Sequence, residues 1–399
     1  MKELLKKLIQ AEPTGDKGEL AAAQVLAEYL SGHGIDCRID RWDGSRANFI
    51  AQISSNGERD ALLFAAHLDV VPPGEAEWKL PPFEAAEAGG RIYGRGAADM
   101  KGPLASLAGA MVEIVKEGTK LKGDLLLTFV DGEESGRAEI GIWSLIGKGY
   151  KTDFAIFCEP TNFENIYNKS KGEIYFDIKV KGESTHICNR YKTIWPQKSK
   201  KEQIGVNAID KMVRIINALT ELERSWGLDY YDPDLDPGTT TVTVSMIRGG
   251  ESFSAQAGEC EMTIASMFDP SLTVNDVKDQ LMGTIDYVAS HDHWLKDHRP
   301  EVKLPFPAKV PLKVPRDSEA IKTLVSAFEK IAGKAPTVRP SPFVGDVNYL
   351  FEKGVNGVNW GPGDLNMGIH GANEYVPVEQ VLQATKAYAM AAADWCGVA

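Results

Sequence analysis

The sequence of 399 residues predicts an α/β protein, in which a domain built on a mainly parallel sheet carries an inserted α+β domain. Two patterns support this expectation. Short continuous apolar runs are typical of parallel strands buried on both faces, and they occur at 62–71, 125–130 and 154–158. From residue 172, apolar and polar residues instead alternate with period two, as in an antiparallel sheet with one solvated face. The predicted boundaries are 1–171 and 309–399 for the two halves of the first domain and 172–308 for the insertion.

The composition is that of a globular protein that binds neither nucleic acid nor membranes. Hydrophobic residues make up 43% and charged residues 25% of the chain. The net charge of −12 disfavours nucleic acid and anionic membranes as partners. Residues 1–7 read as a charged amphipathic helix rather than a signal peptide, and no apolar run approaches the ~18 residues of a membrane span. Five scattered cysteines suit reduced thiols, so we expect a cytoplasmic protein.

The strand at 62–71 ends in a histidine and an aspartate that suit a metal site. The elements before it are a helix over 16–30 and strands at 37–39 and 49–53. Side chains alternate along a strand, so His67 and Asp69 should share one face, where His67 would bind a metal and Asp69 would accept its other N–H. A buried histidine satisfied by a nearby aspartate is the commoner interpretation of a lone pair of this kind. The metal hypothesis therefore depends on further ligands downstream.

Carboxylates and a second histidine do recur at later strand ends. Asp99 follows glycines that permit tight turns and precedes a helix from Gly102, where an isolated aspartate would ordinarily be a helix N-cap. The strands at 125–130 and 154–158 end in acidic residues, and a histidine follows the last strand at 355–360. These residues are Glu133, Glu134, Glu159 and His370. Two imidazoles with several carboxylates suit two divalent ions, Zn²⁺ first and Co²⁺ or Mn²⁺ next, with one glutamate left as a general base.

The predicted insertion contains alternating strands and amphipathic helices. The strands are expected at 174–180, 242–246 and 260–264, and the helices at 206–222 and 274–288. Helical spacing then returns at 321–331 before Gly333, and a closing helix starts at about Val378. The cluster His291-Asp292-His293 has metal-ligand residue types, but its charged surroundings predict a solvated connector.

Five segments resemble the dinuclear metallopeptidase and deacylase family of acetylornithine deacetylases, succinyl-diaminopimelate desuccinylases, aminoacylases and glutamate carboxypeptidases. The segments are Ala66-His67-Leu68-Asp69, Gly94-Arg95-Gly96-Ala97-Ala98-Asp99-Met100-Lys101-Gly102, Asp131-Gly132-Glu133-Glu134-Ser135-Gly136, Cys158-Glu159-Pro160-Thr161 and His370-Gly371-Ala372-Asn373-Glu374. They occur in the family's order and span nearly the whole chain.

This resemblance implies a role for each candidate residue. One metal would be held by His67, Asp99 and Glu159. The other would be held by the bridging Asp99 together with Glu134 and His370. Glu133 would be the general base and Asp69 the partner of His67. The insertion would be a lid that also forms a homodimer, and His186 would complete the oxyanion site, often from the neighbouring subunit.

The expected function is metal-dependent hydrolysis of an amide bond in a small substrate, removing an acyl group from an amino acid or a related amine. A dipeptidase or carboxypeptidase using the same site is the alternative. A non-catalytic binder of small molecules is disfavoured because every core residue of the family pattern is present.

Two departures from the family pattern concern substrate recognition. Where lid strands of the family carry Asn-x-x-Pro and Arg-x-x-Pro segments, this chain has 254–257 (Ser-Ala-Gln-Ala) and 267–270 (Met-Phe-Asp-Pro). Met267 cannot pair with a substrate carboxylate, as an arginine can. We therefore expect a substrate whose recognised end is neutral or differently placed, unless Arg190, Lys192 or Arg248 has taken over. The loop after His186 is also enlarged and basic, and it includes Lys198, Lys200 and Lys201.

Overall fold

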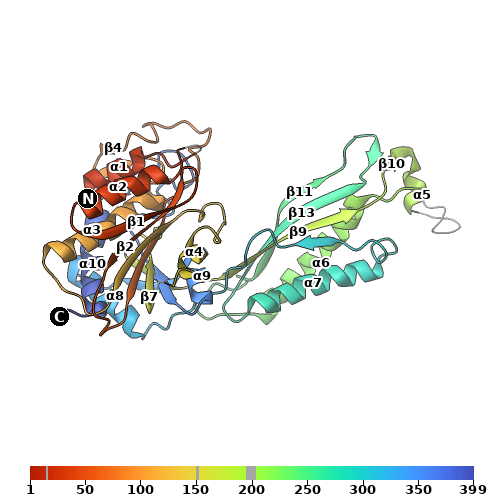
Figure 1. The fold of residues 1–399 in the computed structure, drawn as a ribbon. Helices are drawn as coiled ribbons and strands as arrows, with labels where there is room; N and C mark the ends of the chain where they lie inside the picture. Colours follow the sequence, from red (N-terminus) through yellow and green to blue (C-terminus); the bar gives the residue numbers. More distant parts are fainter. Residues whose placement is uncertain (15–16, 150–151, 195–203) are drawn as a thin grey trace. The chain divides into compact units, whose positions relative to one another are not determined.

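The computed structural model describes residues 1–14, 17–149, 152–194 and 204–399. These residues form two compact units (Figure 1). The first unit comprises Met1–Ser170 and Leu312–Ala399, and the inserted unit comprises Lys171–Pro311. Lys198, Lys200 and Lys201 of the predicted basic loop lie outside the described residues.

The first unit is built on a mixed sheet of eight strands whose centre is parallel. In spatial order its strands are β1 (Asp36–Asp43), β2 (Arg46–Ile53), β6 (Leu125–Val130), β3 (Leu62–His67), β7 (Phe154–Phe157), β16 (Asn356–Asn359), β8 (Asn165–Lys169) and β15 (Thr337–Pro340). The pairs β6–β3, β3–β7 and β7–β16 are parallel, whereas β1–β2 and β2–β6 are antiparallel. Every residue of β3, β6 and β7 is buried, as their continuous apolar runs predict. The predicted α/β fold class is confirmed.

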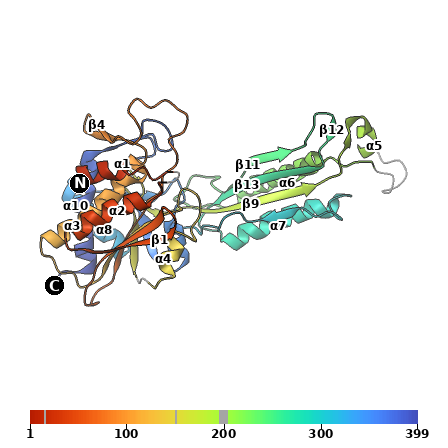
Figure 2. The ribbon, with the colours of Figure 1, turned by 45° about the horizontal axis from the view of Figure 1, so that its top comes forward.

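Helices cover both faces of this sheet (Figures 1 and 2). One layer contains α1 (Lys2–Gln10), α2 (Leu20–Ser31), α3 (Gly102–Lys116), α8 (Glu319–Ala332) and α10 (Val378–Cys396). The shorter α4 (Ile142–Ile146) and α9 (Val347–Glu352) pack on the other face, where the rings of Trp143 and Tyr349 meet edge to face. A small sheet of β17 (Tyr375–Pro377), β5 (Arg91–Tyr93) and β4 (Ala86–Ala88) lies beside α3. With both faces covered, only the strand ends of the parallel sheet can present polar residues to a ligand.

The inserted unit is an antiparallel sheet covered by helices on one face. Its strands, in spatial order, are β11 (Thr241–Gly249), β13 (Glu259–Phe268), β9 (Gly172–Lys181) and β14 (Glu301–Lys303). Alternate residues of β9 and β13 pack against α6 (Ala208–Asp229) and α7 (Val274–His291) in a separate core. A short two-stranded antiparallel sheet of β10 (Thr185–His186) and β12 (Ala255–Gln256) and helix α5 (Arg190–Ile194) complete the unit.

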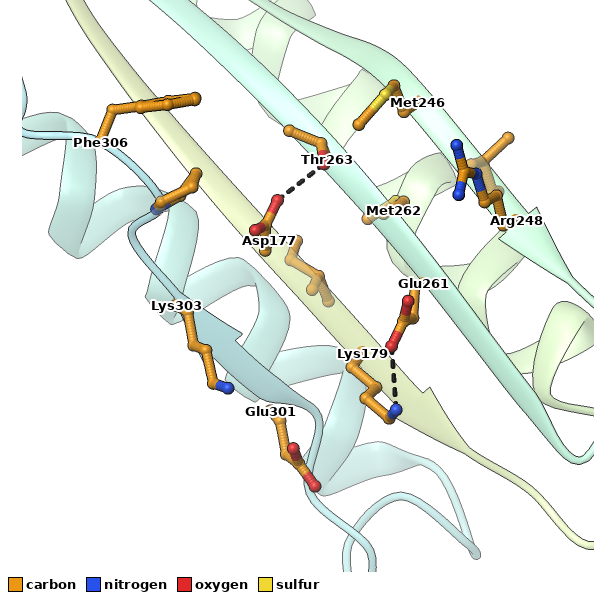
Figure 3. A pocket seen from close by; sticks show the side chains of 13 residues that line it. Asp177, Lys179, Met246, Arg248, Glu261, Met262, Thr263, Glu301, Lys303 and Phe306 are labelled. Atoms are coloured by element: carbon orange, nitrogen blue, oxygen red, sulfur yellow. Dashed lines mark hydrogen bonds and ion pairs between the residues drawn. The ribbon is translucent and has the colours of Figure 1, made fainter. Parts of the chain in front are cut away.

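The open face of this sheet carries charged pairs between neighbouring strands. Lys179 of β9 donates to Glu261 of β13 at 2.9 Å, and Thr263 donates to Asp177 at 2.7 Å (Figure 3). These side chains line a groove of about 400 Å³. Opposite charges on facing strands are a favourable arrangement for a solvated sheet surface, and they account for the period-two pattern of the sequence.

In the part of the chain that is described, no helix combines the length and the apolar character that a membrane crossing requires.

Candidate metal and catalytic site

The ends of the central parallel strands bring five of the predicted site residues, Asp99, Glu133, Glu134, Glu159 and His370, to one cavity. His67 is the last residue of β3, Glu133 and Glu134 follow β6, and Glu159 follows β7. The cavity has a volume of about 350 Å³. Its lining comprises Asp99, Glu133, Glu134, Glu159, Pro160, Phe343, Val344, Gly345, Leu365, Ile369 and His370. The lining therefore combines acidic groups with apolar side chains.

Asp99 lies between the two histidines. Its Oδ1 is 3.0 Å from Nε2 of His67, and its Oδ2 is 3.5 Å from Nε2 of His370. Nε2 of His370 is also 3.1 Å from Oε2 of Glu134. The alternative role of Asp99 as a helix N-cap is not observed, because α3 is preceded by Lys101 and has no side-chain cap. The two oxygens of Asp99 instead face two separate imidazoles, which is the arrangement that a bridging carboxylate requires.

The donor set fits divalent metal ions. Ligand atoms of His67, Asp99 and Glu134 lie within 4.8 Å of one another, and they are the one such cluster in the described ranges of the chain. Oε1 of Glu134 is buried and has no hydrogen-bond partner, so one of its acceptor positions is open to a cation. Imidazole with carboxylate is a combination that Zn²⁺ and similar ions favour. Glu159 lies outside this cluster but lines the same cavity.

The electrostatics of the cavity reflect crowded carboxylates in a buried setting. Hydrogen bonds to Asp99 and Glu134 raise the pKa of His370 to about 10. Burial alone would lower the pKa of His67, but hydrogen bonds to Asp69 and Asp99 raise it well above its usual value. Burial and the charge of Asp99 raise the pKa of Glu159. Such a concentration of negative charge attracts cations, whether protons or metal ions.

The predicted geometry of the His67–Asp69 pair is wrong in one respect. Strand β3 ends at His67, so the alternation of side chains along a strand does not extend to Asp69. Nδ1 of His67 is 2.9 Å from the backbone carbonyl of Asp69 and 3.5 Å from its carboxylate Oδ1. The other carboxylate oxygen of Asp69 accepts a 3.0 Å hydrogen bond from the backbone N–H of Glu134. Asp69 thus contacts His67 and also fixes the backbone of a second site residue.

His186 belongs to the inserted unit, where it pairs with Ala255 in the two-stranded sheet of β10 and β12. Its Nδ1 accepts a 3.2 Å hydrogen bond from the backbone N–H of Cys188. A neutral imidazole with an accepting Nδ1 carries its proton on Nε2. This exposed side chain therefore presents an N–H donor.

The cluster at 291–293 is not a metal site in this structure. His291 and His293 are exposed, as expected of a solvated connector, but the prediction is wrong for Asp292, which is buried. The Asp292 carboxylate pairs with Lys211 and Arg214 of α6. The segment therefore joins the end of α7 to α6.

Several buried charged residues beside the cavity were not predicted from the sequence. Glu19 pairs with Arg46 at 2.6 Å, and Asp131 lies 3.7 Å from the same guanidinium. Burial together with Asp69 and Glu19 raises the pKa of Asp131 to about 7. Arg95 and Glu374 form a second buried pair. Arg95 and Glu374 belong to two of the segments that resemble the family. The one signal in the sequence is that a charged residue stands among glycines and alanines in each segment.

Comparison with known proteins identifies the family of this chain. Residues 63–394 match the model of peptidase family M20/M25/M40. The chain is 32% identical over 388 residues to the N-formyl-4-amino-5-aminomethyl-2-methylpyrimidine deformylase of Bacillus subtilis (strain 168), covering 93% of this chain and 88% of that protein. It is 26% identical over 403 residues to a succinyl-diaminopimelate desuccinylase of Gluconacetobacter diazotrophicus, covering 97% and 94%.

Solved structures give the same fold. An M20 family metallo-carboxypeptidase from Sulfolobus solfataricus superposes with a TM-score of 0.76 at 18% identity, covering 99% of this chain and 98% of that one. A dinuclear metal-binding M20 peptidase from Bacillus subtilis superposes with a TM-score of 0.63 at 15% identity, covering 98% and 96%. The expected hydrolase of amide or peptide bonds is confirmed, and the chain belongs to peptidase family M20/M25/M40.

Proposed function

We propose that this chain removes a small, uncharged acyl group from an amine that lacks a carboxylate at its recognised end. The observation that carries the proposal is the cavity beside the candidate metal ligands. Apart from its acidic residues and His370, the cavity has an apolar lining that includes Phe343, Val344, Leu365 and Ile369, here called the apolar wall. None of the described lining residues is a lysine or an arginine. A substrate carboxylate placed against these apolar side chains would be desolvated without a lysine or arginine to pair with, which is unfavourable.

The inserted unit supports the same substrate class. Met267 occupies the place where the family resemblance predicts an arginine, and the following Asp269 is buried and accepts from Thr240 at 3.1 Å. Of the cations that might replace that arginine, Arg190 is paired with Asp210, and Lys192 lies 5.6 Å from the ring centroid of Tyr191. Arg248 lines the groove on the open face of the inserted unit's sheet. The substrate for which the deformylase relative is named carries a formyl group on an aminomethylpyrimidine without a carboxylate. The succinyl group in the name of the desuccinylase carries one.

We assign the metal ligands as the family resemblance implies. His67, Asp99 and Glu159 would hold one ion, and Asp99, Glu134 and His370 would hold the other, with Zn²⁺ as the first candidate. Bound ions of this kind acidify water and polarise the substrate carbonyl. The cysteines are free in the structure, which supports a reducing compartment such as the cytoplasm.

The protein's own residues would then carry the proton and the developing charge. Glu133 takes a proton from the attacking water as general base, and it delivers that proton to the amine nitrogen as the C–N bond breaks. Nε2–H of His186 donates to the oxyanion of the tetrahedral intermediate. Asp69 keeps the ring of His67 and the backbone of Glu134 in place.

We further propose that the inserted unit forms a homodimer through β11. Within the described residues, β11 has a strand neighbour on one side only. Met246 and Ile247 on this edge are about half exposed, as are Ile209 and Val213 on the neighbouring α6. A second copy related by a two-fold axis would pair the two edges and cover both apolar patches. Ile247→Lys should give monomers in light scattering, whereas Tyr287→Lys on α7 should not. Monomeric wild-type protein would contradict this assignment.

A matched substrate pair tests the proposed function. N-formyl-2-phenylethylamine and N-formylphenylalanine differ only in the α-carboxylate. With Zn²⁺- or Co²⁺-loaded protein, we expect kcat/KM for N-formyl-2-phenylethylamine to be at least ~10-fold higher than for N-formylphenylalanine. This ratio corresponds to about 1.4 kcal/mol of transition-state binding. N-acetylornithine, N-acetylmethionine and dipeptides should be poor substrates. Values of about 10⁴ M⁻¹s⁻¹ or more for any of these would refute the proposal, and activity on dipeptides would favour a dipeptidase.

A further inference from the structure

We propose that Glu374 and Arg95 are positioning residues that hold Asp99 and His370 in the geometry that two metal ions require. The inference rests on the proposed ligand roles of Asp99 and His370. Neither positioning residue lines the cavity, and both are almost fully buried. They act on the backbone of the two segments that carry the ligands.

The carboxylate of Glu374 is surrounded by donors from the segment that ends in Asp99. Its Oε1 accepts from the backbone N–H groups of Ala98 at 2.9 Å and Asp99 at 3.0 Å. Its Oε2 accepts from the backbone N–H of Gly96 at 2.9 Å and from Nη1 of Arg95 at 2.6 Å. One of these four bonds reaches the backbone of the proposed bridging ligand itself. The side chain of Glu374 therefore fixes the position from which the Asp99 carboxylate projects.

Arg95 connects the same carboxylate to the segment that carries His370. Its Nη2 donates to the carbonyl of Gly371, the residue after His370, at 2.9 Å. The same nitrogen lies 3.4 Å from the carbonyl of Pro72, on the loop that follows β3. The guanidinium also lies 5.2 Å from the ring centroid of Trp78. Three segments that are distant in the sequence are thus joined through one planar group.

Neither glutamine at position 374 nor lysine at position 95 can reproduce this arrangement. Glutamine at position 374 would place an NH₂ group where the carboxylate accepts from N–H groups, so two donors would face each other. Lysine at position 95 keeps the charge but lacks the planar fork that reaches two acceptors in fixed directions. Groups that orient metal ligands in this way typically contribute 10- to 100-fold to metal affinity.

The test compares metal binding in variants with matched controls. Glu374→Gln and Arg95→Lys change the positioning pair, whereas Glu379→Gln and Arg91→Lys make the same changes at nearby sites outside it. Metal-depleted full-length protein is titrated with Co²⁺ in competition with a chelator, and the visible absorption of bound Co²⁺ reports its coordination. The unfolding temperature of the metal-free protein is measured in parallel.

We expect both positioning variants to bind at least one Co²⁺ about 10- to 100-fold more weakly and with an altered spectrum, and both controls to match wild type. If Glu374→Gln does not fold, Arg95→Lys carries the test, since it keeps the buried charge. Wild-type affinity and spectrum in a folded Arg95→Lys variant would overturn the inference. An Asp99→Asn variant that kept both ions at full affinity would also overturn the inference, because the inference requires Asp99 to be a metal ligand. Two-ion binding by wild type without hydrolysis of N-formyl amines would refute only the proposed substrate.

Discussion

Asp292 should stabilise the inserted unit rather than bind metal. Its Oδ1 accepts from the backbone N–H groups of Trp294 at 2.9 Å and Leu295 at 3.0 Å. Its Oδ2 accepts from Lys211 at 2.9 Å and from Arg214. Burial alone would raise the pKa of this carboxyl, but the backbone N–H of Leu295 and the ammonium of Lys211 lower it to about 2.

The contribution of Asp292 to the free energy of unfolding follows from this pKa. A carboxyl that titrates near 3.8 in the unfolded chain and near 2 in the folded unit contributes about 2 kcal/mol above pH 5. Because its folded pKa is the lower one, this contribution is complete above about pH 5 and is lost as the pH falls towards 2. At pH 3 it should have fallen to about 1 kcal/mol. In Asp292→Asn the two backbone bonds to Oδ1 remain possible, and both cations can reach solvent, so the expected cost is these 2 kcal/mol and not more.

Native-state hydrogen exchange in α6 and α7 measures this free energy within the full-length protein. At pH 6, Asp292→Asn should lower protection by about 2 kcal/mol, and the difference should be about half as large at pH 3. Asp286→Asn is the matched control, since Asp286 lies on α7 in an exposed pair with Arg299 and should change protection by less than ~0.5 kcal/mol. Equal effects of the two variants, or added protection of residues 287–293 on addition of Zn²⁺, would refute the structural role.

Three further outcomes follow from the site. Glu133→Gln should keep both metal ions and lower kcat by roughly 10² or more, whereas Glu134→Gln should lose metal; metal analysis with steady-state kinetics decides, and an active Glu133→Gln contradicts the assignment of the base. Mixing inactive Glu133→Gln subunits with inactive His186→Ala subunits should restore activity. In the mixed dimer, one site combines the intact Glu133 of one chain with the intact His186 of the other. No recovery despite subunit exchange would mean that each chain uses its own His186. Leu365→Arg should raise kcat/KM for N-succinyl-2-phenylethylamine relative to the N-formyl compound by ~10-fold or more, since it adds a cation to the apolar wall; an unchanged ratio would show that this wall does not contact the acyl group.

The sequence predicts most of the fold because its signals are local. The run Leu125–Val130 is apolar throughout and is followed by Asp131-Gly132, so β6 begins and ends where expected. The ligand types at the strand ends could be read in the same way. The position of Asp69 could not, because a chain that leaves extended geometry after His67 no longer alternates its side chains.

The roles of Glu374 and Asp292 depend on contacts that leave no local pattern. Glu374 bonds to backbone groups nearly 280 residues earlier in the chain, and backbone N–H groups are the same in every sequence. Asp292 lies between two histidines, which suggested metal ligands or solvent, but its partners are on α6, about 80 residues away. A charged residue within a family motif is therefore best examined for structural contacts before a catalytic role is assigned to it.

The chemistry of the site and the choice of substrate depend on different residues. The residues proposed to hold metal and move protons match the family segments, and they would cleave an amide bond whatever the charge on either side of it. In the proposed function, recognition depends on Met267 and on the apolar wall that contains Leu365, where the chain departs from a site built for carboxylates. These residues would contact the parts of the substrate that do not react. Substitutions there should therefore change the ratio of kcat/KM between two substrates more than they change metal affinity. A panel of substrates that differ by one carboxylate therefore distinguishes a deformylase-like enzyme from a desuccinylase-like one, although both share the same motifs.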